Sequence, residues 1–214
     1  MTWPSERKPP ASARLRAGPS GRRAGTDRLE ALPADRPGDG ALLLRIRADD
    51  ASALDLLLER YWPQVYRYAL RRTGSADTAA DLAQDVFCRV WERRAAWRPE
   101  GSVRGLLFRL ARNTAVSHHR RRFARERAAG VFAHLHGGVT VSPLASDSPD
   151  LRATLDRAIA ALPARRREVF RLRMVDDLSY DEIADAMGTS RQTVANQLSR
   201  ALATLRQRLA HLLD

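Results

Sequence analysis

Apolar residues recur at steps of three and four along most of the chain, the spacing that places them on one face of an α-helix. The first such face is formed by Leu54, Leu57, Leu58, Tyr61, Val65 and Tyr68. Pro63 interrupts this segment, and because proline lacks an amide hydrogen we expect the helix to kink or restart there. Gly74 predicts the C-cap, and Ser75 or Asp77 predicts the start of the next helix.

Two further helices are predicted before residue 122. The first has an apolar side made of Leu82, Val86, Phe87, Val90 and Trp91, and a different side made of Asp77, Asp81, Gln84, Asp85 and Cys88. The second begins at about Val103, has an apolar side of Leu106, Leu107, Leu110 and Thr114, and ends in the basic run 118–122. Because no segment alternates apolar and polar residues as a strand does, the predicted fold class is all-α.

Composition divides the chain into four parts. Residues 1–40 are rich in Pro, Gly, Arg and Ser without a helical pattern, so they are expected to form a disordered basic arm. Residues 123–150 lose the pattern again and are expected to form a flexible linker. The helical segments 41–122 and 151–214 are therefore predicted to be two small helical domains.

The segment 178–209 predicts a helix-turn-helix. Ser179 and Glu182 have the spacing of a capping box, and Gly188 supplies the left-handed turn that ends the first helix. Ser190 caps a second helix, whose apolar side is Val194, Leu198, Leu202 and Leu205. Two helices joined in this way can present the second helix to a DNA major groove.

The outer side of that second helix carries side chains that can bond base edges and phosphates. They are Arg191, Gln192, Thr193, Asn196, Ser199 and Arg200. The helix contains no acidic residue that would repel DNA. The alternative is a solvated helical hairpin with ordinary polar residues outside, and the basic character of the whole chain favours DNA binding over it.

Charge and cysteine content narrow the classes of function. The formal net charge of +12 and the pI of about 11.2 predict a polyanionic partner, either nucleic acid or an anionic membrane surface. No apolar run approaches the ~20 residues that span a bilayer, and the N-terminus lacks the apolar core of a secretory signal. Cys88 is the single cysteine, which excludes an intrachain disulfide and favours a reducing cytoplasm.

Enzymatic chemistry is not predicted. The sequence contains no P-loop, dinucleotide fingerprint or Ser/His/Asp spacing, so we expect no catalytic residues, cofactor or small-molecule substrate. A metal-dependent nuclease using Asp81 and Asp85, with His134 and His136, is a third class of function. It is disfavoured because the two histidines sit in a glycine-rich segment with no further ligand nearby.

Two stretches of the chain resemble bacterial RNA polymerase sigma factors. Residues 81–91 (DLAQDVFCRVW) are similar to the family's helix that docks on the polymerase clamp. The second stretch comprises 161–163 (ALP), 167–170 (REVF), 178–184 (LSYDEIA), 193–194 (TV), 198–202 (LSRAL) and 205–206 (LR). The order of the two stretches, and the absence of a third domain between them, resembles the extracytoplasmic-function group.

The resemblance implies a division of labour between the two domains. The domain at 41–122 would bind core polymerase and the −10 promoter element, and the domain at 151–214 would bind the −35 element. The implied partners are the β′ clamp and β flap of core RNA polymerase, promoter DNA and an anti-sigma factor. Asp81, Gln84 and Asp85 would form the docking patch, although such a pattern alone is more often a solvated face.

The resemblance also implies which residues contact the −10 element. The loop that captures unstacked bases would contain Trp97, Arg98, Ser102 and Arg104, although Trp97 and Val103 alone would be interpreted as core residues. Duplex phosphates would be contacted by Arg112, Asn113, His119, Arg120 and Arg121. The −35 element would be contacted by the six polar residues named for the second helix of the helix-turn-helix.

The chain departs from the family pattern in two places, which leaves the base preferences open. Residues 193–198 read TVANQL where the family commonly has TVKSRL, and the segment 97–105 differs from the usual loop. The alternative function is a stand-alone helix-turn-helix regulator. It would account for 178–209 but not for the acidic patch on the 77–91 helix.

Overall fold

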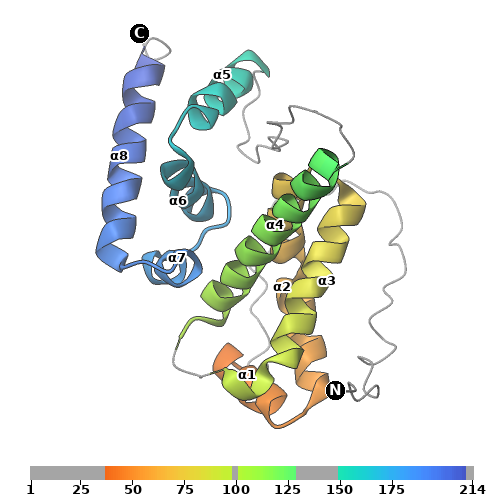
Figure 1. Ribbon diagram of the computed structural model, residues 1–214. Coiled ribbons are helices and arrows are strands. Elements are labelled where there is room, and N and C mark those ends of the chain that lie inside the picture. Colours follow the sequence, from red (N-terminus) through yellow and green to blue (C-terminus); the bar gives the residue numbers. More distant parts are fainter. Residues whose placement is uncertain (1–36, 98–100, 129–148, 211–214) are drawn as a thin grey trace.

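The computed structural model describes residues 37–97, 101–128 and 149–210, and within them every regular element is a helix (Figure 1). This confirms the predicted all-α class. The predicted arm, except for its last four residues, and positions 129–148 of the predicted linker lie outside the described residues. No helix in the described ranges is both long enough and apolar enough to cross a bilayer.

The first unit consists of α1 (Asp39–Arg47), α2 (Ala51–Thr73), α3 (Ala76–Glu92), the short 3₁₀ turn η2 (Arg94–Ala96) and α4 (Val103–Ala128). Helices α2, α3 and α4 pack along one another, and α1 packs on α2. Their shared core includes Leu57, Val65, Val86, Val90, Leu107 and Phe108. The predicted apolar faces are thus buried, with only Leu58 and Trp91 partly exposed.

Helix α2 continues through Pro63, so the predicted restart is wrong. A proline inside a helix removes one backbone hydrogen bond and costs roughly 3 kcal/mol. Buried residues on both sides of it, Tyr61 and Val65, hold the helix against the core. The predicted caps are confirmed: Gly74 adopts φ 69° after α2, and the Ser75 side chain accepts a hydrogen bond from the amide of Thr78.

Two predicted boundaries are also wrong. Helix α1 begins at Asp39, inside the segment assigned to the arm, because its carboxylate accepts hydrogen bonds from the Tyr61 hydroxyl and from Arg60. Helix α4 ends at Ala128, six residues beyond the predicted boundary at 122, and the next helix begins at Pro149. The predicted linker 123–150 therefore loses residues to helices at both ends.

The second unit consists of α5 (Pro149–Ala160), α6 (Ala164–Met174), α7 (Tyr180–Met187) and α8 (Arg191–Leu209). Its core includes Leu172, Leu178, Ile183, Val194, Leu198 and Leu205, and Leu202 is partly buried. The Ser179–Glu182 capping box is present, and Gly188 adopts φ 61° in the turn between α7 and α8. The predicted helix-turn-helix is confirmed.

The two units pack against each other. Helix α7 lies beside the N-terminal half of α4, and α6 approaches α2 through side-chain contacts described below (Figure 1). On one side of this contact are α6, α7 and the turn between them, and on the other side are α2 and α4. We call it the inter-unit interface. Periodicity predicted the helices on each side of this interface but not the interface itself.

Candidate polymerase and nucleic-acid interfaces

The acidic side of α3 is exposed. Asp81, Gln84 and Asp85 point outward, while the alternating residues Leu82, Ala83 and Val86 are buried. None of the three polar residues has a hydrogen bond or ion pair with another described residue. This patch is therefore free to meet a basic surface on a partner. Burial, together with Asp85 and Glu92, raises the pKa of the adjacent Cys88 thiol.

The predicted −10 loop is largely occupied by contacts within the chain. The indole N–H of Trp97 donates to the carbonyl of Val90 at 2.9 Å, and the ring is partly buried against the core. Val103 is buried. Arg98 lies outside the described residues.

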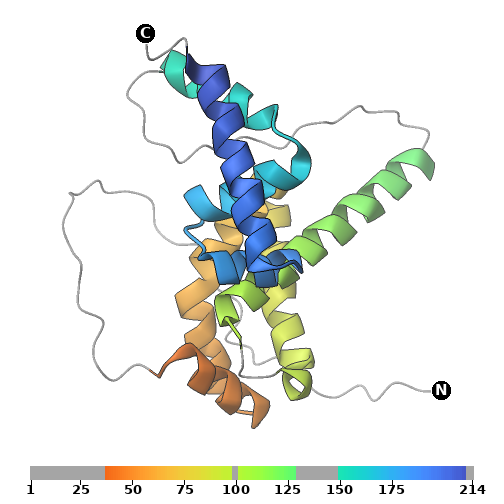
Figure 2. The ribbon, with the colours of Figure 1, turned by 90° about the vertical axis from the view of Figure 1, so that its left-hand side faces the viewer.

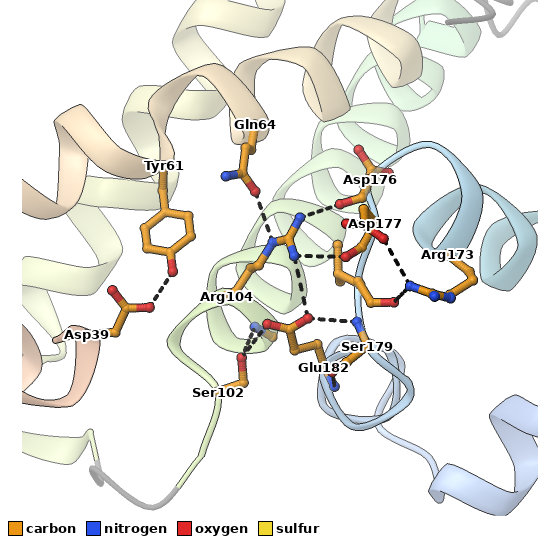
Figure 3. Close-up of polar contacts among 12 residues, drawn as sticks. Asp39, Tyr61, Gln64, Ser102, Arg104, Arg173, Asp176, Asp177, Ser179 and Glu182 are labelled. Carbon is orange, nitrogen blue, oxygen red and sulfur yellow. Dashed lines mark hydrogen bonds and ion pairs between the residues drawn. The ribbon is translucent and has the colours of Figure 1, made fainter. Parts of the chain in front are cut away.

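Arg104 reaches from α4 into the inter-unit interface (Figure 3). Its Nε donates to Gln64 Oε1 at 2.9 Å, Nη1 donates to the carbonyl of Asp177 at 2.9 Å, and Nη2 donates to the carbonyl of Asp176. Nη1 also lies 3.6 Å from the Glu182 carboxylate. Ser102 donates from Oγ to Glu182 Oε1 at 3.1 Å. In this conformation both predicted DNA-binding residues are held by the second unit.

The other predicted −10 residues lie further along α4 and are accessible. Arg112 is partly buried, while Asn113, His119, Arg120 and Arg121 are exposed. Figure 2 shows the C-terminal half of α4 extending away from the other helices. Arg125 and Arg127 on this extension are also exposed, and the sequence interpretation missed them by ending the helix at 122. The sequence does indicate a longer basic helix, because residues 118–127 contain five arginines and one glutamate.

The outer side of α8 has the accessibility expected of a reading helix. Arg191, Gln192, Asn196, Ser199 and Arg200 are exposed, and Thr193 is partly buried with its amide capped by Ser190 Oγ. Gln192 donates to Asn196 Oδ1 at 3.1 Å. The helix itself has no acid, but Asp181 of α7 lies 3.7 Å from the guanidinium of Arg191. This exposed pair is weak, so Arg191 can exchange it for a phosphate.

Several charged residues in the inter-unit interface were not singled out by the sequence. The Tyr68 hydroxyl donates to Glu168 Oε1 and Arg72 Nη1 donates to Glu168 Oε2, both at 2.8 Å. Arg71 pairs with Asp176. Burial raises the pKa of Asp176, and Glu168 adds to this, although Arg71 and Arg104 act in the opposite direction. The Tyr68 pKa is raised well above its ordinary value, mainly by burial.

A metal site is not formed by the described residues, where no three His, Cys, Asp or Glu side chains gather suitably for a metal ion. Asp81 and Asp85 are exposed on one helix face, and His134 and His136 lie outside the described ranges. The nuclease alternative therefore gains no support from the part of the chain that is described.

Comparison with known families gives two matches, one in each unit. Residues 57–125 match the model of Sigma-70 region 2, and residues 152–205 match that of Sigma-70, region 4. The ECF RNA polymerase sigma factor SigL of Mycobacterium tuberculosis (strain CDC 1551 / Oshkosh) is 30% identical over 173 residues, covering 77% of this chain and 93% of SigL. RNA polymerase sigma factor YlaC of Bacillus subtilis is 27% identical, covering 73% of this chain and 92% of YlaC.

Solved structures give the same result at the level of the fold. The sigma factor RpoE in complex with the anti-sigma factor NepR, from Bartonella quintana, matches with a TM-score of 0.56 and 26% identity, covering 73% of this chain and 96% of RpoE. CnrH in complex with the cytosolic domain of CnrY matches with a TM-score of 0.57 and 23% identity, covering 81% and 97% of the two chains.

Proposed function

The chain belongs to the extracytoplasmic-function RNA polymerase sigma factors, and on this premise we propose how its two units divide the work of directing polymerase to promoters. The first unit binds core polymerase and the −10 element, and the second unit binds the −35 element. The observation that carries this division is the helix-turn-helix of the second unit, which leaves the polar side of α8 exposed along its first three turns.

Core polymerase is bound through the acidic side of α3. The exposed Asp81, Gln84 and Asp85 suit a basic helical surface such as the β′ clamp, because no other described residue pairs with them. The second unit docks on the β flap. Holding one polymerase at two sites places both units on the same promoter.

The −10 element is bound by α4 and the loop before it. Asn113, His119, Arg120 and Arg121 contact phosphates along the exposed part of the helix, together with Arg112. Trp97, Arg98, Ser102 and Arg104 contact the melted strand, where aromatic and cationic side chains can hold unstacked bases. Since Ser102 and Arg104 are engaged with α7 and the turn before it, this second set of contacts requires the inter-unit interface to open.

The −35 element is bound by the N-terminal half of α8. Arg191 and Arg200 bind phosphates, and Gln192, Thr193, Asn196 and Ser199 lie between them in a position to contact base edges. The Ser190 cap fixes the start of the helix, so these side chains enter the groove in a defined register.

The proposed regulatory partner is an anti-sigma factor. RpoE of Bartonella quintana is bound to one in its solved structure, and CnrH is bound to the cytosolic domain of CnrY. The chain performs no covalent chemistry of its own in this scheme and requires no cofactor, because the polymerase supplies the catalysis. We further propose that it acts in the cytoplasm, where polymerase is found.

Run-off transcription with purified core polymerase on a genomic fragment library tests this function. We expect defined transcripts that require both the chain and the core enzyme. Asp85→Arg should remove them, whereas Glu59→Arg, an equal change of charge on an exposed position of α2, should not. The competing function, a stand-alone helix-turn-helix regulator, predicts instead sequence-specific gel shifts by the chain alone and no stimulation of core polymerase.

A further inference from the structure

We propose that the helix-turn-helix unit inhibits the first unit within the free chain, and that the inter-unit interface is the inhibitory contact. The proposal rests on the proposed function, because it takes Ser102 and Arg104 as −10 residues. It concerns a state of the chain alone, before polymerase, DNA or another protein binds.

Two pairs of charged groups hold α6 and the turn after it to α2. Glu168 is 7% exposed, and its two carboxylate oxygens accept separate hydrogen bonds, one from the Tyr68 hydroxyl and one from Arg72. Arg71 and Asp176 form the second pair, with 11% and 5% of their side chains exposed. A buried carboxylate needs such partners, so Glu168 and Asp176 specify how the two units fit together.

Arg104 provides the contact from α4. Three of its nitrogens donate to three acceptors, and two of these are the successive carbonyls of Asp176 and Asp177. Asp177 adopts φ 52°, a conformation that L residues seldom take, in the turn that presents these carbonyls to the guanidinium (Figure 3). Arg104 cannot make these bonds and bind DNA at the same time, which is why the interface is inhibitory.

Gly105 permits the close approach of α4 and α7. A Cβ atom at this position would lie 2.8 Å from Asp185 Cβ and 3.1 Å from the carbonyl oxygen of Glu182. Both distances are shorter than ordinary carbon contacts, so any side chain here would push the helices apart. The contact therefore depends on a glycine inside α4, a position where alanine would favour the helix more.

The character of the interface indicates that it can open. Beside an apolar core that is continuous across the two units, it contains buried hydrogen bonds and ion pairs, as do contacts between domains that move relative to each other. Asp176 Oδ2 is buried without a hydrogen-bond partner among the described residues, which weakens the closed state. Water satisfies all of these groups once the units separate.

The test compares Gly105→Ala with Gly40→Ala in the full chain. Gly40 lies in α1, and a Cβ there meets nothing within 4 Å, so it controls for replacing a helical glycine. We expect Gly105→Ala to increase the radius of gyration in small-angle scattering. It should also increase affinity for a random-sequence single-stranded 20-mer at least threefold, while Gly40→Ala matches the wild type. Unchanged scattering, or an opened chain with unchanged DNA affinity, would overturn the proposal.

A second variant tests whether the effect of Gly105→Ala comes from opening of the inter-unit interface or from a local change at Gly105. Glu168→Gln removes a charge from the other side of the interface, and we expect it to open the chain and raise DNA affinity in the same direction. Opposite effects of the two variants would contradict the proposal that both substitutions open the same inter-unit interface. Failure of the proposed function is a separate result: neither the wild type nor Gly105→Ala would then support run-off transcription with core polymerase, whatever the scattering shows.

Discussion

Replacing Arg200 by alanine tests the assignment of α8 as the −35 reading helix. Arg200 is exposed, and its side chain has no hydrogen bond or ion pair with another described residue. The substitution therefore leaves the fold intact and removes one cation from the proposed DNA surface. Fewer phosphates are then neutralised on binding, so fewer counterions are released.

The expected size of the effect follows from the geometry of the helix. At about 1.5 Å per residue, Arg200 lies roughly 14 Å from the start of α8, at the edge of a major groove that is about 12 Å wide. One lost phosphate contact lowers the slope of log K against log salt by about 0.9. Between 50 and 200 mM salt, the wild type should thus lose about 3.5-fold more affinity than the variant does.

The assay is a salt titration of holoenzyme binding to duplex promoter DNA, followed by fluorescence anisotropy. Arg208→Ala is the matched control, because Arg208 is an exposed arginine on the same helix. It lies roughly 26 Å from the start of α8, beyond the groove. Equal slopes for Arg200→Ala and the wild type, or equal losses for the two variants, would refute the assignment.

Three further predictions concern the other surfaces. Asp85→Arg should abolish pull-down of core polymerase without lowering the melting temperature, and retained pull-down would place docking elsewhere. Burial raises the pKa of Asp176 in the closed chain, against Arg71 and Arg104 and with Glu168 beside it, so closure takes up a proton. The fraction of closed chains, measured by small-angle scattering, should therefore rise as the pH falls through the raised pKa of Asp176 towards its ordinary value of 3.8. An equal rise in Asp176→Asn would exclude this group as the cause. Removal of residues 130–143, which lie outside the described residues, should abolish run-off transcription from promoters that need both elements; full activity would argue against simultaneous binding of both.

The helices that periodicity predicted are those that bury one continuous apolar stripe. In α2 and α8 the inward residues repeat over several turns, so their burial follows from the spacing alone. Helix α1 was not predicted, because its N-cap Gly38 and its first residues, Asp39 and Gly40, are typical of a loop. What stabilises its start is a contact between Asp39 and Tyr61, which lie 22 positions apart.

The candidate sites likewise contain some features that the sequence predicts and others that it does not. Exposure of the acidic side of α3 and the polar side of α8 was predictable, because each is the reverse of an apolar face. The engagement of Arg104 with the second unit was not, since two of its three acceptors are backbone carbonyls more than 70 positions away. Every residue has a backbone carbonyl, so no sequence pattern shows which two carbonyls will accept hydrogen bonds from the Arg104 guanidinium. Glu168 likewise resembles a surface residue within the charged segment 165–168 and is buried only because Tyr68 and Arg72 meet it.

The length of α4 determines how substitutions along it combine. Arg104 and Arg121 lie on one uninterrupted helix, 17 residues apart, which corresponds to about 25 Å along its axis. Substitutions separated by more than about 10 Å without shared partners usually have additive free-energy effects. The contact that closes the chain and the cations that meet DNA can therefore vary independently. A change at Gly105 and a change at Arg121 should multiply their effects on promoter binding, which lets selection adjust the resting state of the protein without altering the DNA surface.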